Sequence, residues 1–127
     1  MIPLRDSTPS NTFPLVTVCL IIINLLIFSY ETTLGSQALD ALIYTFGMVP
    51  ANYTNYNGSW AGYLPFLSST FLHGSWMHVI GNMWVLWLFG DNVEDKMGRG
   101  RFLFFYLLCG LIAGIAHFIF NPASQVP

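Results

Sequence analysis

Charged residues are scarce in this sequence: Asp, Glu, Lys and Arg together make up 8% of its 127 residues. An ordinary soluble domain carries roughly 25%, and a chain this poor in charge does not cover a water-facing surface. Only four of the charged residues are basic, and the formal net charge is −2. No basic patch is dense enough to indicate a nucleic-acid partner. The composition therefore predicts a single domain whose partner is a lipid bilayer.

Cysteine is also scarce, with only Cys19 and Cys109. Both lie inside apolar runs, which predicts two small buried hydrophobic residues. A disulfide framework and a zinc site are not indicated, because each needs more or differently spaced cysteines. The sequence predicts neither a metal nor a cofactor.

What the chain has in abundance is apolar sequence, at 54% of its residues. Three runs, at about 13–30, 75–92 and 102–120, predict transmembrane helices. Eighteen helical residues reach about 27 Å, close to the hydrocarbon thickness of a bilayer. A signal peptide is the alternative for the first run, but no small-residue cleavage site follows it.

The distribution of basic residues predicts the orientation of these spans. Segment 31–74 contains no Lys or Arg, and the four basic residues are Arg5, Lys96, Arg99 and Arg101. Two spans separate Arg5 from the other three, so all four lie on one side, which the positive-inside rule makes cytoplasmic. We expect a multi-pass protein of the cell (inner) membrane, with a cytoplasmic N-terminus, a cytoplasmic loop at 93–101 and an outer loop at 31–74.

The long outer loop carries a helix pattern of its own. Leu39, Leu42, Ile43 and Phe46 recur at helical spacing, and Gly47 follows as a stop signal. This pattern predicts a short amphipathic helix at the membrane interface. An aromatic stretch suited to headgroup depth follows, formed by Trp60, Tyr63, Phe66 and Phe71.

Two polar side chains, His78 and Asn82, stand four residues apart in the second span. They share one helix face, and in lipid each would lack hydrogen-bond partners, so they face the bundle or a cavity. Three interpretations stay open from these residues: hydrogen bonding between helices, catalysis, or a metal or haem site. Ser75 precedes His78 by three residues, and we interpret it as the helix N-cap rather than as a nucleophile.

Other small or charged residues favour structural roles. Gly110 and Gly114 form a GxxxG step in the third span, which predicts that another helix packs closely there. Glu94 and Gly98 lie at the cytoplasmic end of the second span. We expect Glu94 to tie down a loop by accepting backbone or arginine hydrogen bonds.

An ordered set of residues in the second half resembles the rhomboid family of intramembrane serine proteases. Its core is His73-x4-His78-x3-Asn82, followed by Glu94 and Gly98. Flanking segments that fit the family are Phe46-Gly47-Met48-Val49-Pro50, Thr70-Phe71-Leu72, Leu86-Trp87 with Phe89-Gly90, and Arg101-Phe102-Leu103 with Tyr106. A single HxxxxH would be weak, whereas this ordered set is specific.

The resemblance implies an all-α membrane protein with a six-helix core, of which residues 1–127 would form a partial domain with three transmembrane helices. It implies a serine endopeptidase that cleaves transmembrane protein substrates with a Ser-His dyad. In that family, residues at the positions of His78 and Asn82 donate hydrogen bonds to the oxyanion. The position of His73 supports the outer loop and the entrance to the second helix, and Glu94 matches a structural acidic position.

The Gly-x-Ser-Gly segment and the later histidine of the family are absent from these residues. We therefore expect the 127 residues to be the first half of a rhomboid protease, inactive and poorly folded alone. Two alternatives remain. One is a rhomboid-like protein that binds clients without cleaving them. The other is a membrane subunit that binds haem or a metal through His78 and His117.

Overall fold

The computed structural model describes residues 12–127, and Arg5 lies outside the described residues. The described chain is helical and contains no β-strand. Its helices, in chain order, are α1 (Leu15–Thr33), α2 (Ser36–Phe46), η1 (Pro50–Tyr53), η2 (Trp60–Tyr63), α3 (Pro65–Ser68), η3 (Ser69–Phe71), α4 (Trp76–Met97) and α5 (Arg99–Phe120).

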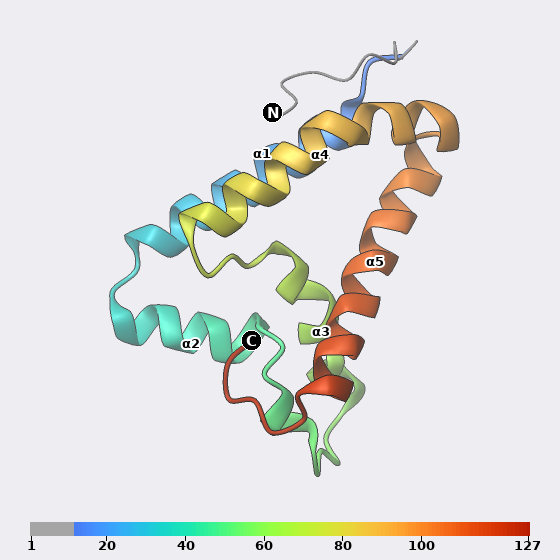
Figure 1. Cartoon of the computed structure of the whole chain (residues 1–127). Helices are drawn as coiled ribbons and strands as arrows, with labels where there is room; N and C mark the ends of the chain where they lie inside the picture. Colours follow the sequence, from blue (N-terminus) through green and yellow to red (C-terminus); the bar gives the residue numbers. More distant parts are fainter. Residues whose placement is uncertain (1–11) are drawn as a thin grey trace.

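Helices α1 and α4 lie alongside each other, and α5 diverges from them like the second arm of a V (Figure 1). The face of α1 that packs inward is formed by Thr17, Leu20, Asn24, Phe28 and Glu31. These residues recur at intervals of three and four, the spacing of one helix face. Phe28 packs with Val79 and Met83 of α4, which form the described apolar core together with partly buried neighbours.

Gly98 makes the turn between α4 and α5. Its φ is +82°, a conformation that favours glycine, and Arg99 already belongs to α5. The predicted loop at 93–101 is therefore helical apart from Gly98, and both helices extend beyond the predicted spans. The interhelical connection can be this short because one glycine takes up the whole change of direction.

The segment between α1 and α4 folds into short helices, of which α3 and η3 pack on the second half of α5 (Figure 1). The predicted amphipathic helix is confirmed as α2, which ends before Gly47. Its residues are not buried, so α2 lies apart from the helix core. An aromatic cluster joins this segment to α5, and its members are Tyr53, Tyr56, Tyr63, Phe66 and Phe118.

The two glycines of the GxxxG step permit close approach, as predicted. A Cβ on Gly110 would collide with the Thr70 side chain, and one on Gly114 would lie 3.1 Å from the Phe66 carbonyl oxygen. The approaching segment is the end of the outer loop, residues 65–71, rather than one of the long helices.

Two described helices, α1 and α5, are long and apolar enough to cross a membrane. Helix α4 has 22 residues but is more polar, since it carries His78, Asn82 and an acidic last part. That α4 also crosses the membrane stays a prediction. The prediction that Cys19 and Cys109 are buried is wrong. Both thiols are free and exposed, because they lie on faces of α1 and α5 that no described segment covers.

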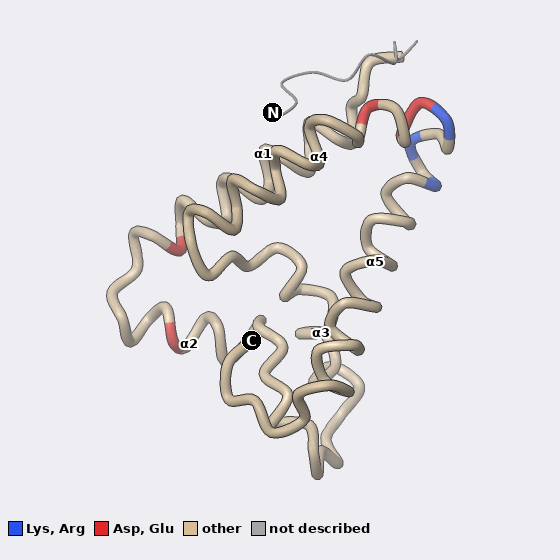
Figure 2. The backbone as a smooth tube through the Cα atoms, in the orientation of Figure 1, with Lys and Arg blue, Asp and Glu red and all other residues tan. Residues whose placement is uncertain are grey.

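The basic residues of the described chain lie at one end, where acidic residues lie beside them (Figure 2). Lys96, Arg99 and Arg101 gather at the connection between α4 and α5, whereas segment 31–74 has no Lys or Arg. This separation places every described basic residue at the end where α1 begins and α4 ends.

Candidate active site

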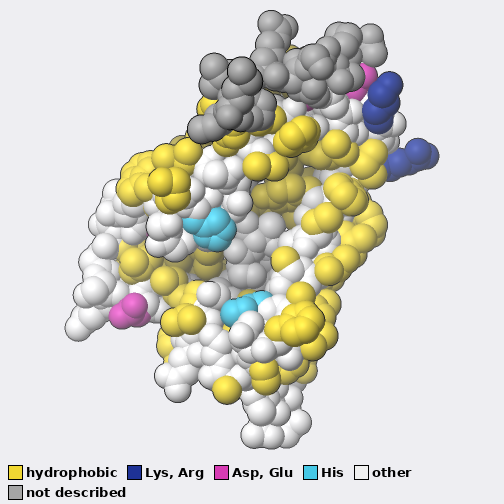
Figure 3. Space-filling model, viewed as in Figure 1, with side chains coloured by type: hydrophobic (Ala, Val, Ile, Leu, Met, Phe, Trp, Pro, Cys, Tyr) yellow, Lys and Arg dark blue, Asp and Glu magenta, His cyan; other side chains and the backbone are white. Residues whose placement is uncertain are grey.

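A cavity of about 750 Å³ opens between the start of α4, the end of α1 and the second half of α5. Figure 3 shows the hollow, with histidine side chains at its margin. The polar residues that line it include Glu31, His73, His78, Asn82 and His117. The structure thus brings His73, His78 and Asn82 to one place, as the spacing of the motif requires.

Helix α4 presents adjacent faces to the core and to the cavity. Val79 and Met83 are buried against α1, whereas His78 and Asn82 line the cavity one turn apart and are exposed. The predicted N-cap is confirmed, because Ser75 Oγ accepts a hydrogen bond from the His78 backbone N–H at 3.2 Å. The cap fixes where the helix begins, and thereby the direction in which His78 and Asn82 point.

His73 precedes α4 and is buried next to these two residues, with only 5% of its surface exposed. Its Nε2 lies 3.3 Å from Nδ2 of Asn82, and its ring meets the His78 ring edge-on, with centroids 5.2 Å apart. Its backbone N–H donates a hydrogen bond to Oε2 of Glu31 at 3.4 Å. His73 therefore contacts both cavity-facing residues of α4 and also the end of α1.

Burial lowers the pKa of His73 below its ordinary value of 6.5, and the neighbouring His78 lowers it further. The backbone carbonyl of Phe71 opposes the shift with a smaller effect. His73 is therefore neutral at pH 7. A neutral imidazole keeps one nitrogen free to accept a hydrogen bond.

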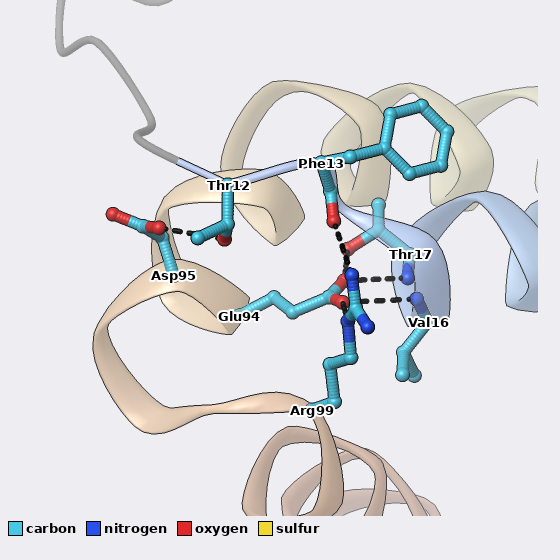
Figure 4. Close-up of polar contacts among 7 residues, drawn as sticks. All are labelled: Thr12, Phe13, Val16, Thr17, Glu94, Asp95 and Arg99. Atoms are coloured by element: carbon cyan, nitrogen blue, oxygen red, sulfur yellow. Dashed lines mark hydrogen bonds and ion pairs between the residues drawn. The ribbon is translucent and has the colours of Figure 1, made fainter.

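Glu94 lies at the far end of α4, away from the cavity, and is buried (Figure 4). Its carboxylate accepts hydrogen bonds from the backbone N–H groups of Val16 and Thr17 at 3.0 and 2.8 Å, and from the Thr17 hydroxyl at 2.9 Å. Arg99 approaches it at 3.8 Å. Because the first N–H groups of a helix lack partners within the helix, Glu94 caps α1 from another element. These are the contacts expected of a structural carboxylate.

Close approach at this end depends on Gly90. A Cβ there would lie 2.7 Å from Cγ2 of Thr17, so a larger residue would push α1 away from α4. Gly98 lies one turn after Glu94 and allows Arg99 to fold back toward the carboxylate.

The buried polar residues of α1 were not among the predicted site residues. Thr17 bonds Glu94, Asn24 donates to the Tyr106 hydroxyl at 3.3 Å, and Glu31 accepts from His73. All three are buried. Their spacing of seven residues, which puts them on one face of α1, is a signal that could have identified them.

His117 lines the same cavity as His78, from α5. Its Nε2 lies 3.3 Å from the Val126 carbonyl oxygen, and its Nδ1 lies 3.4 Å from the Asn121 amide nitrogen. Both ring nitrogens are thus engaged locally, and metal or haem ligation would have to break one of these contacts. Among residues 12–127, no group of three or more His, Cys, Asp or Glu side chains is placed to hold a metal ion.

Comparison with known proteins points to one family. The family model described as Rhomboid domain matches residues 57–127, a range that includes the whole cavity-lining face of α4. No solved structure matches the chain.

Relatives carry rhomboid names in several lineages. The mitochondrial presenilin-associated rhomboid-like protein A of Danio rerio is 32% identical over 101 residues, which cover 74% of this chain and 26% of the relative. Rhomboid protease GluP of Bacillus subtilis is 35% identical over 98 residues, covering 77% of this chain and 18% of the protease. The chain thus spans about a quarter or less of the length of these two relatives.

Proposed function

The chain belongs to the rhomboid family, and we propose that it forms the N-terminal part of an intramembrane serine endopeptidase that cleaves transmembrane proteins. In this proposal His78 and Asn82 stabilise the oxyanion of the tetrahedral intermediate. The nucleophilic serine and the general-base histidine belong to helices of the intact protein that follow residue 127.

The observation that carries the proposal is the shared orientation of His78 and Asn82. Both side chains are exposed to a single cavity. Apolar side chains at these two positions would have a lower desolvation cost in a membrane. Hydrogen bonding between helices alone does not explain this, since among the described residues the His78 side chain forms no hydrogen bond with α1 or α5 and its ring contact is with His73.

The chemistry follows from the donors. Attack on a peptide carbonyl carbon moves negative charge onto the carbonyl oxygen. Asn82 offers an uncharged NH₂ group, and His78 offers a ring N–H. In a cavity screened from water such donors stabilise the charge strongly and need little reorganisation.

The proposal includes a membrane arrangement. Helices α1, α4 and α5 cross the bilayer as three spans of a six-helix core, and the 31–74 segment lies outside the cytoplasm. The cavity then opens at the outer half of the membrane. In support, the described basic residues gather at the opposite end (Figure 2).

The test is peptidase activity of the intact gene product in liposomes, with a single-span substrate. We expect Asn82→Ala and His78→Ala each to lower kcat by about 10²–10³. The matched control is Asn57→Ala in an exposed turn, which should leave kcat unchanged. If the intact wild-type protein binds clients but never cleaves them, the endopeptidase proposal fails and the rhomboid-like client-binding alternative replaces it.

A further inference from the structure

The hydrogen bond between His73 and Asn82 joins a loop residue to a helix residue at the centre of the cavity. Nε2 of His73 lies 3.3 Å from Nδ2 of Asn82. With the amide nitrogen of Asn82 at this position, Nε2 of His73 accepts and the ring proton resides on Nδ1, which is buried and within residues 12–127 has no other hydrogen-bond partner. In this arrangement His73 is neutral.

His73 is itself held from the side of α1. Its backbone N–H donates to Glu31, and the ring meets Phe28 edge-on at a centroid distance of 6.4 Å. Glu31, Phe28 and His73 are all buried. Asn82, by contrast, is exposed to the cavity, so His73 is the partner that other described residues hold in place.

We infer that His73 is the positioning residue of the oxyanion site: its Nε2 holds one N–H of Asn82 and thereby aims the other N–H into the cavity. The same ring packs against His78 with centroids 5.2 Å apart, so it limits the rotamers of both proposed donors. This inference rests on the proposed function for its catalytic meaning. The hydrogen bond itself can be tested without any reaction.

Protonation of His73 would remove this acceptor, because a charged imidazole has no acceptor nitrogen. The titratable groups that face the ring are Glu31 from α1 and His78 from α4, and His117 of α5 lines the same cavity. Burial and His78 lower the pKa of His73, which keeps the acceptor available at neutral pH.

The first test is nitrogen NMR of the intact protein in nanodiscs. We expect Nε2 of His73 to be unprotonated, Nδ1 to carry the proton, and a scalar coupling across the hydrogen bond to Nδ2 of Asn82. The Asn57 side-chain amide is the control and should show no such coupling. A protonated Nε2, or the absence of the coupling, overturns the inference with no substitution that could disturb folding.

The second test separates positioning from stability by two substitutions. His73→Gln keeps an acceptor at the position of Nε2 but does not titrate, whereas His73→Phe keeps a ring and removes the acceptor. We expect His73→Phe to lower kcat about tenfold to a hundredfold with little change in KM, as expected for a misplaced catalytic donor. We expect His73→Gln to keep most of the wild-type kcat. Its activity should also fall less than that of the wild type as the pH is lowered.

Equal losses in the two variants, or an unchanged acid limb in His73→Gln, would overturn the positioning role. An intact protein without peptidase activity would instead contradict the proposed function. The NMR result would still decide whether His73 holds Asn82.

Discussion

At the scale of single residues, the buried carboxylate of Glu94 joins the end of α4 to the start of α1. It accepts from two backbone N–H groups and one hydroxyl at the start of α1. Arg99 is 57% exposed at its side chain and lies 3.8 Å away, so water screens most of that ion pair. The backbone bonds therefore account for most of what Glu94 contributes to stability.

Glu94→Gln should destabilise the protein by about 2 kcal/mol, since hydrogen bonds to a charged acceptor are each worth about 1.5–3 kcal/mol and the amide turns an N–H toward donors. Unfolding in mixed micelles with rising SDS, followed by tryptophan fluorescence, measures the change. The matched control is Asp40→Asn on the exposed surface of α2, which should shift the midpoint little. Equal midpoints for both variants would refute the capping role.

His73 predicts a dependence of stability on pH. Its pKa is lowered in the folded protein, so the unfolded state binds the proton more readily. The contribution of neutral His73 is complete above its ordinary value of 6.5, and it is lost as the pH falls through the lower folded pKa. We expect the unfolding midpoint of wild type to fall between pH 7 and pH 5 more than that of His73→Gln. Parallel curves would show that another group causes the acid sensitivity.

The residues themselves show what sequence reasoning could reach. The cap at Ser75 and the shared face of His78 and Asn82 follow from local spacing, which a sequence contains. The partners of Asn24 and Glu31 do not, because Tyr106 and His73 lie 82 and 42 residues away along the chain. Such pairs form only when α1 packs against other elements.

At the scale of elements, small residues decide how closely segments pack. Gly110 of α5 leaves room for Thr70 of η3, and Gly90 of α4 leaves room for Thr17 of α1. The GxxxG step predicted close packing, but it could not show that the outer loop, rather than another long helix, is the partner. The identity of the approaching segment is a property of the tertiary structure.

Gly110→Ala should destabilise the protein by about 1–3 kcal/mol, the usual range for an extra methyl group in a filled contact. Gly100→Ala is the control, since nothing lies within 4 Å of the position where its Cβ would be. Because alanine favours the helix over glycine, Gly100→Ala should instead raise the free energy of unfolding by about 0.5–1 kcal/mol. The same SDS titration compares the two. Stabilisation by both alanines would mean that Thr70 does not pack on α5.

The limits of the helices were harder to predict than their existence. Apolar runs predicted α1 and α5 because lipid requires such sequence, whereas charged residues near 93–101 indicated a loop. Those residues are helical because Glu94 has partners in α1 and because Gly98 alone makes the turn. Charge marks where a helix leaves the hydrocarbon, which is a different place from where the helix ends.

At the scale of the whole molecule, the described basic residues are confined to one end. Lys96, Arg99 and Arg101 gather at one end of the V, and the segment from α2 to η3 at the other end has no basic residue (Figure 2). Basic residues near membrane spans favour the cytoplasm. The proposed orientation of the protein therefore depends on very few side chains.

This orientation can be measured by thiol labelling in cells that express the intact protein without Cys19 and Cys109. With Ser36→Cys, a membrane-impermeant reagent should label intact cells, whereas Gly100→Cys should react only after lysis. Replacing Lys96 and Arg101 by Gln removes two of the described basic residues but leaves Arg99 beside Glu94. We expect this pair of substitutions to make both cysteines, at positions 36 and 100, partly accessible in intact cells. The reason is that the charge bias that orients the spans is weakened while the α1–α4 contact is kept. If Gly100→Cys is labelled in intact cells while Lys96 and Arg101 are still present, the proposed orientation is wrong. The proposed active-site cavity would then open toward the cytoplasm.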